Sequence, residues 1–290
     1  MEQIILRAYA KINLCLDVSG RLPNGYHTVK TVMQAVGIFD ELALEKAESG
    51  VAMTTDAVGL PVDGSNLACK AANLMQETYH VKEGVRIRLR KSIPIAAGMA
   101  GGSTDAAAVM LGMNRLFGLE RPREELMRLS VSIGADVPYC ILGGTALAEG
   151  IGEVLTPLPA APACHVLVAK PDFSVSTRDV YERLDAAGKL QHPDVDGMVA
   201  AIERGSLSGV AERLGNVLEG VTVSAFPVID TIKKRMLALG AAGSLMSGSG
   251  PAVFGLFPDE AAADHARRRL EQEALARQLF VTTFVSAGQY

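Results

Sequence analysis

Residues 94–105 read Pro-Ile-Ala-Ala-Gly-Met-Ala-Gly-Gly-Ser-Thr-Asp, and this stretch decides how the chain around it folds. It consists mostly of small residues and carries no charge before Asp105. Apolar and basic residues alternate over residues 85–90, which predicts a strand that enters the stretch, and the apolar pattern of residues 106–117 predicts a helix that leaves it, capped by Gly118. A glycine-rich loop between a strand and a helix exposes backbone amides to phosphate, and the helix dipole favours negative charge there. A tight turn that binds no ligand is the alternative.

The loop matches neither of the two common phosphate-binding sequence types. A Walker loop has a Lys directly before its Ser or Thr, whereas Gly102 precedes Ser103 here. The dinucleotide fingerprint needs three glycines at a fixed spacing, which Gly98, Gly101 and Gly102 do not supply. If the loop binds phosphate, it therefore belongs to a third type.

The composition is that of a globular protein with a large core. The chain has 290 residues, of which 49% are hydrophobic and 21% charged, and it contains no low-complexity block or repeat. Its formal net charge of −4 disfavours nucleic acid as a main partner, because protein surfaces that bind nucleic acid are basic. The four cysteines, at positions 15, 69, 140 and 164, form no Cys-x-x-Cys pair and are expected to be reduced thiols.

No segment predicts export or a membrane partner. The amino end lacks a basic region followed by a long apolar run, so we expect no signal peptide and a cytoplasmic location. Residues 236–258 carry no charge and are long enough to cross a bilayer, but five glycines and Pro251 interrupt them. They are better explained as the end of a helix, a glycine- and serine-rich loop and a strand over residues 252–257.

The rest of the chain mixes strand and helix patterns without regular alternation. Three prolines within residues 156–162 mark the best candidate for a linker between domains. We therefore predict an α+β fold with an N-terminal domain over residues 1–156 and a C-terminal domain over residues 157–290. The other predicted elements are strands over 4–18, 28–38, 40–45, 165–169 and 280–287, a hairpin turn at Pro23-Asn24-Gly25, and helices over 66–79, within 120–134, and over 177–187, 226–239 and 260–278.

Two charged residues, Lys11 and Asp136, are candidates for catalysis of phosphoryl transfer. Lys11 lies in a strand pattern among apolar neighbours, where a buried Lys needs a partner; a surface Lys on an edge strand is the alternative. Asp136 lies two residues before Pro138, and capping of a helix is its alternative role. As a pair, the Asp would accept the proton of an acceptor hydroxyl while the Lys neutralises charge on the phosphoryl group.

Tyr26 and His27 follow the predicted hairpin turn and suggest recognition of a base. An aromatic ring offers a stacking face, and a His offers an edge with a donor and an acceptor. Packing against the turn is the alternative for both residues.

Three motifs, in order along the chain, resemble those of the GHMP small-molecule kinases. Residues 94–107 resemble the phosphate loop of that family, residues 8–14 (Ala-Tyr-Ala-Lys-Ile-Asn-Leu) its amino-terminal motif, and residues 248–254 (Gly-Ser-Gly-Pro-Ala-Val-Phe) its carboxy-terminal glycine motif. The resemblance implies a two-domain kinase fold that uses ATP with Mg²⁺. In that fold the N-terminal domain is similar to a ribosomal protein and the C-terminal domain is ferredoxin-like.

Further motifs at residues 25–28, 134–138 and 148–153 narrow the resemblance to the GHMP kinases that act on a cytidine-diphosphate-linked methylerythritol. The resemblance implies transfer of the γ-phosphoryl group of ATP to the 2-hydroxyl of that small-molecule substrate. This reaction belongs to the non-mevalonate route to isoprenoid precursors. The sequence does not specify an oligomeric state.

The same resemblance assigns roles to individual residues. Lys11 and Asp136 fall at the catalytic positions of the family. Tyr26 and His27 fall at its cytosine-binding positions, with Tyr181 as a second aromatic on the base. The remaining assignments are Asn13 and Thr177 for the polar chain of the substrate, Asn66 for the adenine, and Pro94, Ile95, Ala96, Ala97, Gly98, Met99, Ala100, Gly101, Gly102, Ser103 and Thr104 for the phosphates of ATP.

The chain departs from the family pattern at three loop positions. Met99 stands where Leu is commoner, a change that conserves volume. Thr104 and Asp105 replace a more usual Ser and Asn, and Asp105 places an acidic group near the expected phosphates, where it would weaken ATP binding or assist the magnesium ion. The sequence does not identify a ligand for that ion, for which Glu149 and Ser103 are the candidates.

Three other functions stay open from the sequence. A nucleotide-binding regulator would retain the loop without needing both Lys11 and Asp136. An RNA-binding module would fit the ribosomal-protein-like domain but not the acidic composition. A sister kinase of homoserine or mevalonate type would share the loop, although Gly25-Tyr26-His27 would then have no purpose.

Overall fold

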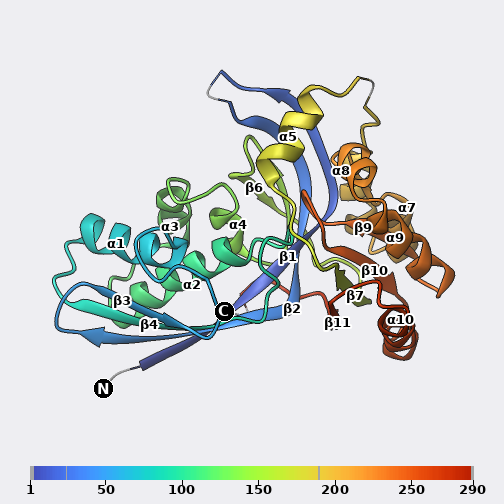
Figure 1. Cartoon of the computed structure of the whole chain (residues 1–290). Coiled ribbons are helices and arrows are strands. Elements are labelled where there is room, and N and C mark those ends of the chain that lie inside the picture. The colour runs from blue at the N-terminus through green and yellow to red at the C-terminus, as the bar shows by residue number, and fades with distance from the viewer. Residues whose placement is uncertain (1–2, 24, 189, 289–290) are drawn as a thin grey trace.

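The structure, a computed structural model, describes residues 3–23, 25–188 and 190–288 and is built around two β-sheets (Figure 1). The first sheet has seven strands, of which five follow the order β3-β4-β2-β1-β8, while β5 pairs with β2 and β6 with β5. The strand that leads into the glycine-rich loop, β4, is therefore an inner strand. The bounds are β1 Gln3–Arg21, β2 His27–Ala47, β3 Val51–Thr55, β4 Gly84–Arg90, β5 Thr145–Glu149, β6 Val154–Pro157 and β8 Gly215–Asn216.

The antiparallel hairpin of β1 and β2 is the longest feature of the first sheet. The predicted strands over residues 28–38 and 40–45 form one continuous strand, because pairing with β1 continues through Phe39. The predicted turn at Pro23-Asn24-Gly25 includes Asn24, which lies outside the described residues.

The middle of β1, residues 10–16, is buried on both of its faces. Ile12 belongs to the apolar core, whereas Lys11 and Asn13 point to the opposite face of the strand. The backbone N–H of Lys11 donates a hydrogen bond to the carbonyl oxygen of Met99 at 3.2 Å, so the glycine-rich loop covers this part of the strand. The interpretation of Lys11 as a surface residue on an edge strand is therefore wrong.

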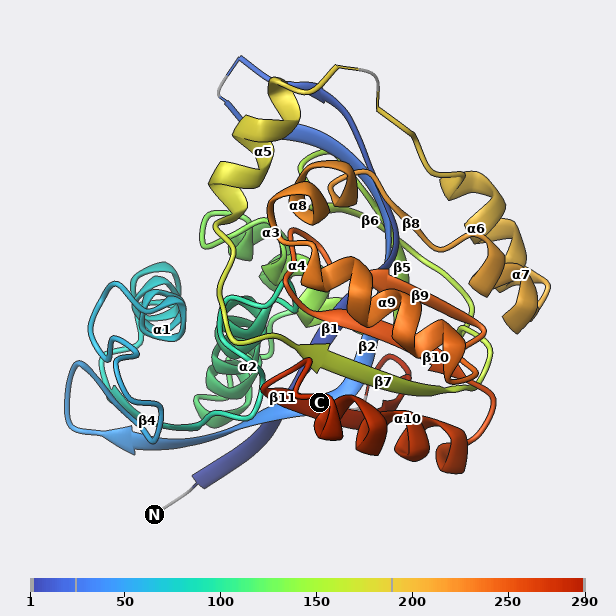
Figure 2. The same cartoon turned by 45° about the vertical axis from the view of Figure 1, so that its right-hand side comes forward.

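The second sheet has four antiparallel strands in the order β11-β7-β10-β9, and helices α9 and α10 lie against it (Figure 2). The charge-free residues 236–258 fold as the end of α9, then β9, a loop and β10. The sequence does not predict β9, because Gly243 and Ser244 lack the side chains typical of a strand. No helix among the described residues has the length and apolar character that a membrane span requires. The bounds are β7 His165–Lys170, β9 Gly243–Met246, β10 Val253–Phe257 and β11 Gln278–Thr283.

The described residues form ten helices. Helix α2 begins at Gly101, five residues before the predicted start at residue 106, so the Gly-Gly-Ser-Thr part of the motif is the first helical turn. The sequence does not predict α6, α7 and α8, which have nine residues or fewer and show no long apolar period. The bounds are α1 Leu67–Tyr79, α2 Gly101–Leu116, α3 Arg123–Ser130, α4 Val137–Leu142, α5 Thr177–Asp185, α6 Val195–Glu203, α7 Leu207–Glu212, α8 Glu219–Ala225, α9 Val228–Ala238 and α10 Glu260–Gln272.

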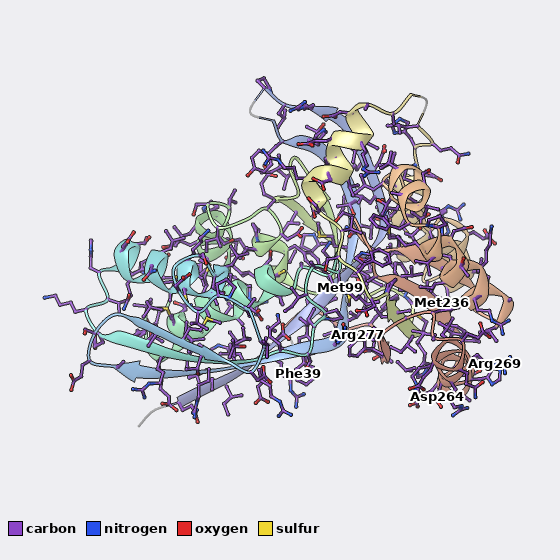
Figure 3. All side chains as sticks on the ribbon, in the orientation of Figure 1. Phe39, Met99, Met236, Asp264, Arg269 and Arg277 are labelled. Carbon is purple, nitrogen blue, oxygen red and sulfur yellow. The ribbon has the colours of Figure 1, made fainter. Side chains whose placement is uncertain are left out.

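One apolar cluster joins the two sheets. It packs Ile12 of β1 and Phe254 of β10 together with Met99 of the glycine-rich loop, which is 1% exposed and lies between the two halves of the molecule (Figure 3). A further bridge connects Val36 of β2 with Phe284, directly after β11. The glycine-rich loop is thus built into the core that both sheets share.

The connection from β6 to β7 runs through residues 158–164, which have no regular secondary structure. Strand β8 follows this connection in the sequence but pairs with β1 in parallel. The division into domains over residues 1–156 and 157–290 stays a prediction.

Candidate active site

One cavity, of about 470 Å³, lies where the glycine-rich loop meets the start of α1, the start of α2, α5 and the residue that precedes α4. Tyr26, His27 and Thr104 do not line it. Most of the predicted site residues do line it, namely Lys11, Asn13, Asn66, Asp136, Thr177, Tyr181 and loop residues 94–103.

The glycine-rich loop bends through three residues in the left-handed backbone region, which are Ala96 (φ 52°), Gly98 (φ 76°) and Ala100 (φ 57°). At Gly98 a Cβ atom would lie only 2.1 Å from the carbonyl oxygen of Ser247. Glycine is required at this position both for the backbone angle and for the close approach of another backbone.

Ser247, directly before the C-terminal glycine motif, holds the glycine-rich loop in place. The hydroxyl of Ser247 donates to the carbonyl oxygen of Gly98 at 2.9 Å and accepts the N–H of Asn13 at 3.3 Å. The hydroxyls of Ser249 and Thr177 lie 2.9 Å apart, which connects the motif to α5. The sequence patterns assign no role to Ser247, although a hydroxyl beside glycines is a usual partner for loop backbone.

The N-terminus of α2 opens onto the cavity. Its first intrahelical donor is the N–H of Thr104, which bonds to the carbonyl of Ala100 at 2.9 Å, so the amides of Gly101, Gly102 and Ser103 precede the helical ladder. These amides and the helix dipole favour a phosphate at this point. Thr104, predicted among the ATP-binding residues, is instead fully buried, and its hydroxyl donates to the carbonyl of Tyr9 at 2.8 Å.

Lys11 and Asp136 meet in the cavity. The Nζ atom of Lys11 lies 4.0 Å from a carboxylate oxygen of Asp136 and donates to Oδ1 of Asn13 at 2.7 Å. The side-chain NH₂ group of Asn13 donates in turn to the hydroxyl of Thr31 at 2.9 Å. This bond keeps the Oδ1 atom of Asn13 oriented toward Lys11. Asp136 occupies the N-cap position of α4, but its side chain makes no capping hydrogen bond and is 36% exposed, so the carboxylate is not used to cap the helix.

Several aromatic and charged side chains lie together at the outer end of the hairpin that β1 and β2 form. The rings of His27 and Tyr181 are 4.7 Å apart and tilted by 33°. Nε2 of His27 lies 2.6 Å from Asp185, the last residue of α5, whose other oxygen pairs with Arg21 at 3.2 Å. Tyr26, which directly precedes His27 in the chain, is 57% exposed. The sequence analysis missed Asp185, whose spacing of four residues from Tyr181 on a helix is the signal that places both on one side.

Asn66 is the N-cap of α1 as well as a residue of the cavity wall. Its Oδ1 accepts the N–H of Ala68 at 2.9 Å, and its amide donates to the carbonyl of Pro61 at 2.7 Å. Both the oxygen and the nitrogen of this amide form hydrogen bonds within the protein, so Asn66 shapes the part of the cavity wall where adenine is predicted to bind.

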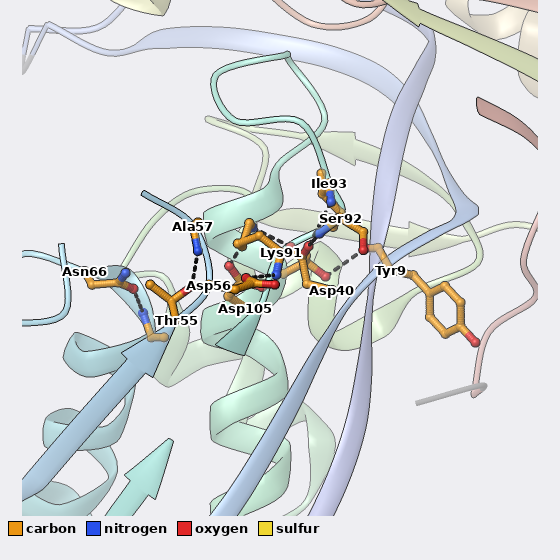
Figure 4. A network of polar contacts seen from close by, with 12 residues as sticks. Tyr9, Asp40, Thr55, Asp56, Ala57, Asn66, Lys91, Ser92, Ile93 and Asp105 are labelled. Atoms are coloured by element: carbon orange, nitrogen blue, oxygen red, sulfur yellow. Dashed lines mark hydrogen bonds and ion pairs between the residues drawn. The ribbon is translucent and has the colours of Figure 1, made fainter. Parts of the chain in front are cut away.

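A buried ion-pair network lies beside the start of the glycine-rich loop (Figure 4). Nζ of Lys91 pairs with Asp105 at 2.9 Å and also with Asp40. Asp40 further accepts the backbone N–H groups of Ser92 at 2.6 Å and Ile93 at 2.8 Å. The sequence analysis missed this network, because the alternating arginines of β4 conceal Lys91 as one more basic residue.

The described residues contain no group of three or more His, Cys, Asp or Glu side chains that could hold a metal ion. Mg²⁺ does not need such a group in a kinase, because it retains several waters and binds substrate phosphates. Ser103, on the first turn of α2, lines the cavity, whereas Glu149 does not. Of the two predicted ligands, Ser103 is therefore the one placed at the cavity.

Comparison with known proteins shows which family the chain belongs to. The sequence model described as GHMP kinases N terminal domain matches residues 66–144, and the one described as GHMP kinases C terminal matches residues 198–277. A 4-diphosphocytidyl-2-C-methyl-D-erythritol kinase of Lachnospira eligens is 53% identical over 283 residues, which cover 97% of this chain and 98% of that protein. The chain belongs to the 4-diphosphocytidyl-2-C-methyl-D-erythritol kinase family of GHMP kinases. The protein of that name from Lachnoclostridium phytofermentans is 47% identical and covers 98% of both chains.

Solved structures of GHMP kinases share the architecture. A crystal structure of 4-(cytidine 5'-diphospho)-2C-methyl-D-erythritol kinase has a TM-score of 0.81 and 36% identity, covering 97% of this chain and 99% of that chain. Homoserine kinase from Cytophaga hutchinsonii has a TM-score of 0.79 at 23% identity, covering 100% of this chain and 96% of that chain, which shows the common fold alone. The predicted α+β fold with N- and C-terminal GHMP kinase domains is confirmed, and the chain is a small-molecule kinase.

Gly98→Ala should destabilise the protein by more than about 2 kcal/mol, because the left-handed backbone alone costs an alanine about 1–2 kcal/mol. Its Cβ would also lie 2.1 Å from the carbonyl oxygen of Ser247. Gly102→Ala is the matched control, since its Cβ would meet the side chain of Leu67 at an ordinary 3.5 Å. Urea unfolding followed by circular dichroism measures both variants. Equal unfolding midpoints for the two alanine variants would contradict the close approach at Gly98.

Proposed function

We propose that this chain transfers the γ-phosphoryl group of ATP to the 2-hydroxyl of 4-diphosphocytidyl-2-C-methyl-D-erythritol, in the non-mevalonate route to isoprenoid precursors. The observation that carries the proposal is the approach of Lys11 and Asp136 to 4.0 Å inside the cavity that the glycine-rich loop lines. Binding of a nucleotide alone would need neither charge, which argues against a regulator. The relative with 53% identity bears the name of this activity.

Different groups of the chain bind the phosphates, accept the proton and stabilise the charge of the transferring group. The amides of residues 101–103 hold the ATP phosphates at the N-terminus of α2. Asp136 accepts the proton of the 2-hydroxyl as the hydroxyl oxygen attacks the γ-phosphorus, and the bond from that phosphorus to the bridging oxygen breaks to release ADP. The buried ammonium of Lys11 stabilises the charge on the transferring group, where exclusion of water strengthens the interaction. Mg²⁺, held by the phosphates, water and Ser103, would neutralise further phosphate charge.

The acceptor extends from this pair toward the end of the hairpin. Asn13 and Thr177 contact its polar chain, and Tyr26 and Tyr181 stack on the cytosine. Because Asp185 occupies Nε2 of His27, the atom left to read the base is Nδ1. In a neutral imidazole this atom is an acceptor, which suits the 4-amino donor of cytosine and not the oxygen of uracil.

A coupled assay for ADP across several alcohols tests the proposal as a whole. We expect ADP formation with 4-diphosphocytidyl-2-C-methyl-D-erythritol in the presence of Mg²⁺ and none with homoserine or mevalonate. Binding of ATP without turnover would indicate a regulator. Turnover of homoserine or mevalonate alone would indicate a sister kinase.

Asp136→Asn and Lys11→Met should each lower kcat by at least about 100-fold, since a positioned acid or base contributes roughly that factor or more. The KM values should change far less, because the interaction forms in the transition state. The double variant should be little worse than the worse single one, as expected of coupled groups.

Asp259→Asn is the matched control for the loss of a carboxylate, because Asp259 caps α10 and does not line the cavity. It should retain wild-type kcat. A near-normal kcat for Asp136→Asn would remove Asp136 from the reaction.

Base selectivity should depend on His27 and Asp185. His27→Ala and Asp185→Asn should each reduce the preference for cytidine diphosphate over uridine diphosphate by about tenfold, since an unpaired edge group costs roughly 1–3 kcal/mol. Tyr26→Ala and Tyr181→Ala should weaken both inhibitors equally, and Tyr181→Phe should retain stacking. Inhibition constants of the two diphosphates measure this. An unchanged preference in His27→Ala would assign base reading to other groups, such as backbone amides.

A cytoplasmic location and the absence of nucleic-acid and membrane partners stay predictions from the sequence. The two-domain division at residue 157 has the same standing.

A further inference from the structure

Three hydrogen bonds in series connect Lys11 with the backbone of β1 through two further buried side chains. The Nζ atom of Lys11 donates to Oδ1 of Asn13 at 2.7 Å, and Nδ2 of Asn13 donates to the hydroxyl of Thr31 at 2.9 Å. That hydroxyl donates to the carbonyl oxygen of Cys15 at 2.7 Å. Lys11, Asn13 and Thr31 are only 5%, 2% and 1% exposed, so water barely competes for these bonds.

The backbone end of the series fixes the direction of every bond in it. A carbonyl oxygen can only accept, so the single hydroxyl proton of Thr31 is used by Cys15, and the hydroxyl oxygen is left to accept. Asn13 must therefore turn its NH₂ group to Thr31 and its oxygen to Lys11. An amide turned the other way would point N–H groups at an ammonium group, which cannot accept a hydrogen bond. The hydroxyl of Thr31 thus determines which atom of Asn13 faces Lys11.

A bulge in β1 places Thr31 at this wall of the cavity. The pairing of β1 with β2 shifts its register between Asn13 and Cys15, so that Thr31 lies opposite Leu16. Because of this extra residue, the positions of β1 that line the cavity are 11, 13 and 16, a spacing that regular alternation does not give. Thr31 lines the same cavity from β2. Bulges beside active sites commonly redirect side chains in this way.

The distance between Lys11 and Asp136 shows what the series achieves. The two groups lie 4.0 Å apart, whereas a direct hydrogen bond between an ammonium group and a carboxylate is about 2.7–2.9 Å long. The bond to Asn13 therefore holds Lys11 back from direct pairing with Asp136. This separation leaves the carboxylate oxygen open to an acceptor hydroxyl and keeps the ammonium group available to a phosphoryl group.

We propose that Thr31 is a positioning residue for phosphoryl transfer and acts on Lys11 through Asn13, an inference that rests on the proposed function. The hydroxyl of Thr31 is buried and makes its hydrogen bonds within the protein, so its effect reaches the reaction through these two side chains. Without it, the amide of Asn13 is free to turn, Lys11 loses its fixed acceptor, and the ammonium group moves onto Asp136.

Replacement of Thr31 by valine and by serine tests this role, because valine has nearly the shape of threonine without the hydroxyl and serine keeps the hydroxyl. Thr31→Val should lower kcat by about tenfold or more, since a hydrogen bond to a charged group depends on the orientation that it loses. The KM values for ATP and for 4-diphosphocytidyl-2-C-methyl-D-erythritol should change by less than about threefold. Thr31→Ser should restore kcat to near the wild-type value, and Thr31→Ala should show the same loss as valine.

Two other buried threonines provide matched controls for loss of a hydroxyl. Thr145 donates to the side-chain amide of Gln34 at 2.6 Å and does not line this cavity. Thr145→Val should therefore lower the melting temperature and retain wild-type kcat. The hydroxyl of Thr222 has no hydrogen-bond partner among the described residues, so Thr222→Val should change neither quantity. A loss of kcat in Thr145→Val as large as in Thr31→Val would assign the effect to stability and overturn the proposal.

Crystal structures of the wild type and Thr31→Val, without nucleotide or substrate, need no turnover and separate this proposal from the proposed function. In Thr31→Val we expect Nζ of Lys11 to leave Asn13 and to lie within about 3 Å of the carboxylate of Asp136. An unchanged position of Lys11 in that variant, or a wild-type kcat, would overturn the proposal. If Lys11 moves as described but the wild type forms no ADP with the expected alcohol, the positioning role stands and the proposed function fails.

Discussion

The contact between Gly98 and the carbonyl of Ser247 is the constraint on which the rest of the site depends. It holds the glycine-rich loop against the C-terminal motif in a bend that a side chain would prevent. Ser247 also bonds to the carbonyl of Gly98 and to the N–H of Asn13, so the loop, β1 and the C-terminal motif meet at one residue. Lys11 lies two residues from Asn13 on the same face of β1 and is placed by the same contact.

Two acidic residues near this point differ in how far water reaches them. Asp136 is 36% exposed at the cavity and lies 4.0 Å from Lys11, an arrangement suited to exchange of a proton with a bound hydroxyl. Asp105 is 3% exposed and lies 2.9 Å from Lys91, an arrangement that holds the start of α2 against the strand before the loop. The chemistry of the two carboxyl groups is the same, and their burial decides which one can serve a substrate.

Local sequence patterns predict much of this structure and only part of the site. The alternation in β1, the period of α1 and the glycine-rich loop are visible because each depends on neighbouring residues. The start of α2 is misplaced by five residues, because glycines that open a helix look the same as glycines in a loop. Asp40 and Lys91 are 51 positions apart in the chain, and Ser247 and Gly98 are 149 apart, so no local pattern contains either pair. The local pattern correctly places Asp136 at the N-cap position of α4 but cannot show that its carboxylate faces Lys11, which comes from β1.

Contacts between the two halves of the molecule restrict how one half can move against the other. Two of these contacts are the hydrogen bond that the hydroxyl of Ser247 donates to the carbonyl of Gly98 and the bridge that Val36 of β2 forms with Phe284. A rotation of one half against the other would break these contacts and pull the glycine-rich loop apart. Among the described residues, the far end carries no such hydrogen bond between the sheets; there the hairpin meets α5 through the ion pair of Arg21 with Asp185 at the surface (Figure 1). A rigid-body opening of the two halves would therefore deform the glycine-rich loop, whereas a displacement of the hairpin end would leave the contacts of that loop intact.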